Sequence, residues 1–165
     1  MTGGETRVPP RAIQDAYPAP VAHCYGCGRL NPHGLQLKSY WVGDETSAVF
    51  RPRSYHTAMP GYVYGGLLAS LIDCHGTGTA AAAASRDAGL DPERDPPLRF
   101  VTAALRVDYL KPTPIDVDLR LRGRVKERMG RRVTVEVTVE AHGEVTARGE
   151  VVAVQMPEAM GRAGA

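Results

Sequence analysis

One aspartate, Asp73, stands inside a segment from residue 54 to residue 85 that carries no other formal charge. Burying an ionised carboxylate without a partner is costly, so such a residue finds hydrogen-bond donors or serves a chemical purpose. Two glycines, Gly65 and Gly66, precede it by about two helical turns. If a helix begins there, its first N–H groups are unpaired and favour negative charge, and glycine lets a ligand carbonyl come close. The segment therefore combines a carboxylate with a potential binding site for an oxyanion.

The spacing of these groups limits how they can act together. Gly66 and Asp73 are seven positions apart, which is about 10 Å along a helix at ~1.5 Å per residue. An attacking group must come within about 3 Å of the carbon that it attacks. One helix cannot readily supply both groups to a single carbonyl, whereas two antiparallel helices can. The spacing therefore favours a site shared by two copies of the chain.

A purely structural role for Asp73 is the alternative, with Ser70, Thr77 or a backbone N–H satisfying the carboxylate. We interpret Asp73 as functional because it follows a glycine pair at a helix start. His75 is expected on a different face of the helix, as a packing residue or in the lining of a substrate site. His56, in the loop before the helix, is expected either in that lining or on the surface.

The three cysteines suggest a different chemistry. Cys24 and Cys27 have the Cys-x-x-Cys spacing of zinc ligands, with His23 and His33 nearby. A second ligand pair at suitable spacing is missing, and Cys74 is expected far away on a buried helix. We therefore predict no metal site and no cofactor, with the first two cysteines filling a tight turn. Cys74 is disfavoured as a nucleophile, because no separate base is evident and buried cysteine is usually inert.

Composition limits the class of protein. A chain of 165 residues with 43% hydrophobic and 23% charged residues fits one soluble domain. A net charge of +2 is too small to favour nucleic acid or an anionic membrane surface as partner. The first twenty residues contain no apolar signal core, and no uncharged stretch is apolar enough for a membrane span. A reducing cytoplasm is the expected location.

The elements that must position Asp73 follow from periodicity. Residues 64–85 are small and apolar over about six helical turns and therefore need to be wrapped by other elements. Strands are predicted near residues 35–41 and 46–51 before the helix. After a polar loop at residues 86–97, a period of two predicts four more strands. One face of the third of these is apolar, through Val133, Val135, Val137 and Val139.

These elements predict an α+β domain in which an antiparallel sheet of about six strands wraps around one long central helix. The expected boundaries are a loosely ordered N-terminal arm at residues 1–22, the domain at 23–156 and a C-terminal tail at 157–165.

Three segments carry a family resemblance: CYGCGRLNPHGLQL, then PGYVYGGLLASLIDCHGTGTA, then VDYLKPTPID. In this order they resemble the hotdog-fold acyl-CoA thioesterases of the PaaI-like branch. The resemblance implies a homodimer with joined sheets, or a tetramer of two dimers, that binds acyl-CoA between protomers and hydrolyses the thioester. It implies that Asp73 is the nucleophile or general base and that N–H groups of Gly65 and Gly66 polarise the carbonyl.

The expected substrate contacts are His56, Tyr64, Gly65, His75 and Thr77. The sequence departs from the family pattern at two places, where Tyr64 replaces a histidine before the glycine pair and Ala58 replaces an asparagine of some members. Two alternatives therefore stay open. One is a non-catalytic module that binds acyl-CoA or an acyl carrier. The other is a hotdog dehydratase or hydratase, against which Tyr64 counts because those enzymes need a histidine paired with an acid.

Overall fold

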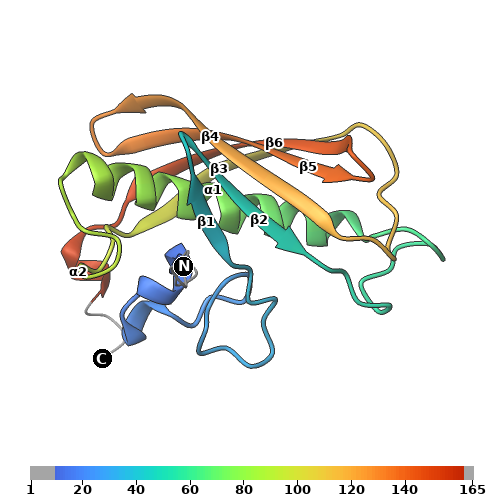
Figure 1. The fold of residues 1–165 in the computed structure, drawn as a ribbon, viewed down its shortest axis with the longest axis horizontal. Helices are drawn as coiled ribbons and strands as arrows, with labels where there is room; N and C mark the ends of the chain where they lie inside the picture. Colours follow the sequence, from blue (N-terminus) through green and yellow to red (C-terminus); the bar gives the residue numbers. More distant parts are fainter. Residues whose placement is uncertain (1–9, 162–165) are drawn as a thin grey trace, which may run out of the picture.

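The computed structural model describes residues 10–161, which form one antiparallel sheet and one long helix (Figure 1). The helix α1 spans Gly65–Asp87. The strands are β1 (Ser39–Val42), β2 (Glu45–Phe50), β3 (Phe100–Tyr109), β4 (Leu119–Met129), β5 (Arg132–Ala141) and β6 (Glu144–Gln155). This confirms the predicted α+β architecture of one central helix and six strands.

The sheet order is β1-β2-β4-β5-β6-β3, and every neighbouring pair is antiparallel. The chain leaves β2 at one side of the sheet, passes through α1 and enters β3 at the far edge, so the helix crosses the sheet (Figure 1). Within the described residues β3 pairs only with β6. One long edge of β3 is therefore left without a strand partner.

The core lies between α1 and the sheet. The valines predicted on one face of β5 are all 2% exposed or less, and Leu71 and Ile72 of α1 are fully buried against the sheet. Gly76 allows a close approach of helix and sheet, because a Cβ there would lie 2.5 Å from Cγ2 of Val151. A glycine inside a packed helix thus has a packing reason.

A β-bulge changes which side chains of β3 face the helix. The register with β6 shifts between Thr102 and Ala104, so one residue is added to β3. Because side chains alternate between faces, an extra residue reverses the alternation beyond it. Thr102 before the bulge and Tyr109 after it therefore both reach α1, at Asp73 and Gly65 respectively.

The prediction of a loosely ordered arm was wrong for residues 10–22. This segment forms two short 3₁₀ helices, η1 (Ile13–Ala16) and η2 (Ala19–Val21). Gln14 is fully buried and donates to Oγ of Ser39 at 3.0 Å while accepting from its N–H at 2.7 Å. Tyr17 is also buried. The segment packs through short 3₁₀ turns and through the buried, hydrogen-bonded side chain of Gln14. Neither feature produces a periodic pattern of apolar residues, so the sequence did not indicate it.

The ends of the chain are described only in part. Residues 1–9 of the predicted arm and residues 162–165 of the predicted tail lie outside the described residues. Of the tail, residues Glu158–Gly161 form a short helix, α2. Among the described residues, no helix has the combined length and apolar character needed to cross a bilayer.

Candidate active site

Asp73 lies on the face of α1 that the chain's own sheet leaves partly open. Four residues of α1 recur every three or four positions and are each half-buried: Gly66, Ser70, Asp73 and Thr77. Leu71, on another face of the helix, is buried against the strands. Positions with this spacing share one face of a helix. The carboxylate therefore belongs to a half-exposed stripe that begins at the first turn of the helix.

One side chain holds the carboxylate. The hydroxyl of Thr102 on β3 donates to Oδ1 of Asp73, and no other described residue donates a hydrogen bond to either oxygen. Ser70 and Thr77 do not satisfy it, because their hydroxyls donate to backbone carbonyls of α1 at 2.9 and 3.0 Å. Burial raises the pKa of Asp73, Thr102 partly offsets this, and nearby Cys24 raises it further. Asp73 is thus a partly desolvated carboxylate with a single donor, which favours the functional interpretation.

The first turn of α1 offers unpaired donors. Tyr64 is the N-cap residue and makes no side-chain capping bond, while Leu67 N–H donates to its carbonyl at 3.0 Å. The N–H groups of Gly65 and Gly66 donate to no described residue. Tyr109 instead donates its hydroxyl to the carbonyl of Gly65 at 2.8 Å, which holds the turn in place. Unpaired N–H groups at a helix start are suitable donors to an oxyanion, and their role here stays a prediction.

Tyr64 lies across this helix start. Its side chain is exposed, and a Cβ at position 66 would lie 2.3 Å from Cε1 of the Tyr64 ring. The glycine at position 66 thus leaves room for the aromatic ring over the backbone. Tyr64 is therefore placed beside any ligand that reaches these N–H groups.

His56 lines a pocket beside the entry to the helix. Its Nδ1 accepts from the N–H of Arg53 at 3.0 Å, and its ring meets that of Tyr55 edge-on at 4.7 Å. Partial burial and the charge of Arg53 lower the pKa of His56. The pocket has a volume of about 420 Å³, and Arg51 and His33 also line it. Asp73 does not line this pocket.

His75 packs in the core, and its expected place among the substrate contacts stays a prediction. It is fully buried, with Nδ1 hydrogen-bonded to Oγ of Ser39 at 2.8 Å and Nε2 to Oγ1 of Thr46 at 3.1 Å. Two positions beyond Asp73 the helix has turned toward the sheet, so the packing role is the one observed. Thr77 remains on the same stripe as Asp73.

A further pocket lies away from these groups. A pocket of about 520 Å³ lies near the C-terminal end of α1 and is lined by Trp41, Arg86 and residues 10–13 and 89–93, among others. Neither this pocket, nor one of about 440 Å³, nor the His56 pocket includes Asp73, Gly65 or Gly66. A single chain thus exposes the carboxylate on a surface rather than enclosing it.

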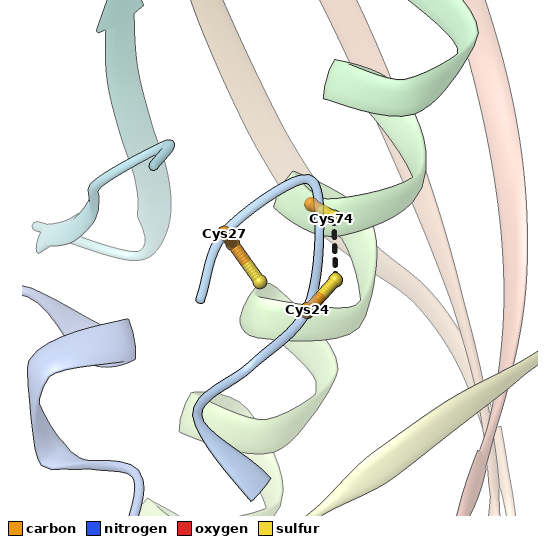
Figure 2. A group of neighbouring side chains, drawn as sticks. All are labelled: Cys24, Cys27 and Cys74. Carbon is orange, nitrogen blue, oxygen red and sulfur yellow. Dashed lines mark hydrogen bonds between the residues drawn. The ribbon is translucent and has the colours of Figure 1, made fainter. Parts of the chain in front are cut away.

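The three cysteines come together, contrary to the prediction that Cys74 lies far from the other two (Figure 2). The segment at residues 22–37 is closed on itself by hydrogen bonds such as Leu35 N–H to the carbonyl of Tyr25 at 2.8 Å, and it lies against α1 with Gly26 next to Cys74. Cys24 and Cys74 then approach to 3.7 Å between their sulfurs. No local pattern signals this contact, because the two residues are fifty positions apart.

The family model described as the thioesterase superfamily matches residues 60–148, more than half of the chain. The chain belongs to this superfamily. It is 52% identical to a thioesterase superfamily protein from Shewanella loihica PV-4, whose solved structure matches with a TM-score of 0.66 and covers 87% of this chain and 99% of that one. This confirms the resemblance to hotdog-fold thioesterases.

More distant structures share the fold. The PaaI protein from the phenylacetic acid degradation operon of E. coli is 13% identical, with a TM-score of 0.61 over 74% of this chain and 81% of that one. A putative thioesterase related to phenylacetic acid degradation from Ralstonia eutropha JMP134 is 18% identical, with a TM-score of 0.58 over 73% of this chain and 85% of that one. The comparison with curated proteins gave no match.

Proposed function

We propose that this thioesterase superfamily member is an acyl-CoA thioesterase whose site forms between two copies of the chain. One observation supports the proposal: Asp73 presents a partly desolvated carboxylate on the open face of α1, with Thr102 as its one donor among residues 10–161. A structural aspartate would have its oxygens satisfied by its own surroundings. A carboxylate whose pKa is raised toward neutral pH is instead suited to act as a base or nucleophile.

In the proposed reaction, Asp73 attacks the thioester carbonyl or takes a proton from the water that attacks it. The N–H groups of Gly65 and Gly66 stabilise the negative charge that develops on the carbonyl oxygen. The carbon–sulfur bond then breaks, and the products are a carboxylic acid and the free thiol of CoA. Water supplies the oxygen of the acid and the proton of the thiol.

A second copy of the chain brings the two parts together. Gly66 and Asp73 of one α1 are about 10 Å apart along the axis at ~1.5 Å per residue. The exposed edge of β3, which includes Leu105 and Tyr109, supports a twofold contact. Pairing of β3 with the same strand of a partner would join the sheets and place the helices antiparallel. A homodimer, or a tetramer of two such dimers, is therefore proposed.

Charge supports CoA as the carrier of the acyl group. The pocket lined by His56 also contains Arg51 and Arg53, and it lies beside the start of α1, where Tyr64 N–H donates to the carbonyl of His56 at 2.8 Å. Arginine side chains suit phosphate groups because they donate in a planar fork. We propose that this pocket binds the nucleotide end of CoA, and that Tyr64 and Thr77 lie along the thioester and acyl part.

The test measures thiol release from a panel of aromatic, short-chain and long-chain acyl-CoA substrates by the purified protein. Asp73→Asn should lower kcat/KM by roughly 100-fold or more, because general-base catalysis typically contributes that much. Asp87→Asn is the matched control, since Asp87 is an exposed aspartate on the same helix. Its rate should stay within about twofold of wild type. A folded, dimeric Asp73→Asn protein with the wild-type rate would refute the proposed role.

One observation favours a second candidate, a module that binds acyl-CoA or an acyl carrier without turnover. The Tyr64 ring lies against Gly66, beside the N–H groups that would otherwise meet the carbonyl. Calorimetry that detects tight binding of acyl-CoA, with no thiol release across the panel, would favour this candidate.

A dehydratase is less well supported, because His75 is buried and His56 contacts Arg53 rather than Asp73. Water loss from a 3-hydroxyacyl thioester without thiol release would favour it.

A further inference from the structure

Three cysteine side chains that have no role in the proposed hydrolysis lie next to one another. Cys24 and Cys27 lie on the segment at residues 22–37, and Cys74 lies on α1 directly after Asp73 (Figure 2). Their sulfurs all lie within 4.8 Å of one another, with 3.7 Å between Cys24 and Cys74. Sulfurs bound to one tetrahedral zinc ion, each at about 2.3 Å, are about 3.8 Å apart. Only a small adjustment of these side chains is needed to reach that spacing.

The backbone is shaped around this cluster. A Cβ at Gly26 would lie 2.2 Å from Sγ of Cys74, so no other residue type fits there without moving the sulfur. A Cβ at Gly28 would lie 2.4 Å from the backbone nitrogen of Cys24. The backbone of this loop therefore holds the three sulfurs close together.

A partly buried cation lies near the cluster. The guanidinium of Arg99 stacks on the ring of Tyr17 at 3.7 Å and is close enough to interact electrostatically with Cys27. Its buried Nε has no hydrogen-bond partner among the described residues. A divalent cation with three thiolates carries one net negative charge, which Arg99 would offset. Such charges near a metal site tune its ligands.

We propose that Cys24, Cys27 and Cys74 bind one thiophilic divalent cation, with Zn²⁺ as the expected occupant. The cation links the segment at residues 22–37 to α1 at the turn that carries Asp73. No fourth histidine, cysteine or acidic residue joins the group among the described residues. The fourth position therefore faces solvent on the exposed side of Cys24 and is taken by water.

The number of sulfurs favours a cation over a disulfide. A bond between Cys24 and Cys74 would join two of the three thiols and leave the buried Cys27 unpaired. One cation engages all three sulfurs at once. Each cysteine binds as a thiolate, so any thiol proton still present is released to solvent when the cation binds.

The test uses the full chain, reduced and stripped of metal, and titrates it with Co²⁺ as a spectroscopic probe. One equivalent should give a sulfur-to-cobalt charge-transfer band in the near ultraviolet and the visible bands of a tetrahedral ion. Zn²⁺ should displace the Co²⁺. Cys24→Ser and Cys74→Ser should each weaken binding at least tenfold. His33→Ala, which removes a nearby exposed imidazole, should leave affinity unchanged within about twofold.

A second measurement compares each protein with itself, with and without a chelator. A strong chelator should lower the Tm of wild-type protein purified with Zn²⁺ by several degrees, because a ligand that binds only the folded state stabilises it. The chelator should not change the Tm of Cys27→Ser. Reduced protein that gives no charge-transfer band would overturn the proposal. So would a band that persists in Cys74→Ser, or purified protein with a Cys24–Cys74 disulfide and no metal.

Discussion

Thr102 on the edge strand β3 donates its hydroxyl to Oδ1 of Asp73 on α1. The same strand reaches the start of the helix, where Tyr109 donates to the carbonyl of Gly65. Both contacts depend on the bulge between Thr102 and Ala104, because a regular strand would turn these two side chains to opposite faces. One edge strand therefore positions both the carboxylate and the first turn of the proposed oxyanion site.

Thr102→Val should lower kcat/KM for acyl-CoA hydrolysis roughly tenfold, because it removes the one donor that fixes Asp73 and a hydrogen bond to a charged group contributes about 1.5 kcal/mol or more. Thr102→Ser keeps a hydroxyl and should restore most of the rate. Thr102 is exposed in the single chain, so circular dichroism and Tm should change little. Equal rates for the valine and serine variants would show that the hydroxyl does not position the carboxylate.

The free edge of β3 predicts how the assembly can be broken. Leu105→Lys places a charge on this edge and should weaken the homodimer at least tenfold, with loss of activity, because lysine on an edge strand opposes strand pairing. Val42→Lys is the matched control, since Val42 is an exposed apolar residue on β1 at the other edge of the sheet. Size-exclusion chromatography coupled to light scattering measures the molar mass of each variant. A monomeric Leu105→Lys protein with full activity would contradict a site shared by two copies.

The fold could be predicted because its signals are periodic and local. Alternation of apolar residues placed β4, β5 and β6, and a long apolar run placed α1. Strand β1 begins at Ser39 rather than near residue 35, because Gln36 has a φ of 52° and Leu37 N–H pairs with the carbonyl of Gly26. Such boundaries depend on contacts that the local pattern does not contain.

The candidate site could be predicted only where its residues are adjacent in sequence. Asp73 and the glycine pair lie on one helix and could be found from their spacing. Thr102 could not, because the bulge that turns it toward α1 has no local signal. The approach of Cys74 to Cys24 was missed for a related reason, since it follows from the folding back of a distant segment. In both cases long-range packing decides which side chains meet.

Gly76→Ala should destabilise the fold by about 2 kcal/mol, within the range for overpacking a close contact, because its Cβ would press on the fully buried Val151. Val151→Ala alone should also destabilise, by leaving a cavity. The double variant should lose less free energy of unfolding than the two single variants lose together, because the smaller side chain at position 151 makes room for the added Cβ at position 76. Unfolding in urea measures these free energies. Strict additivity would mean that the two residues do not limit how closely helix and sheet pack.

His75 belongs to a buried hydrogen-bond network that fits the neutral ring. Ser39 Oγ accepts from Gln14 at 3.0 Å, so its single proton is directed to Nδ1 of His75, and Nε2–H is left to donate to Thr46. A protonated ring would carry a second N–H toward Ser39, and Ser39 would then lose the acceptor of its own hydroxyl proton. Consistent with this, burial lowers the pKa of His75 from 6.5 to about 4.

The free energy of unfolding should therefore fall as pH decreases from about 6.5 to about 4. In this range the unfolded chain binds a proton at His75 that the folded chain does not, so acid favours the unfolded state; above pH 6.5 and below pH 4 this contribution is constant. The loss should be at most about 3 kcal/mol, at ~1.36 kcal/mol per unit of pKa. His75→Gln should be less stable at pH 7, because it disturbs the buried hydrogen-bond network. Its free energy of unfolding should depend less on pH, because glutamine does not titrate. Urea unfolding of both proteins from pH 4 to pH 7.5 measures the difference, and parallel profiles would show that His75 titrates alike in the folded and unfolded chains.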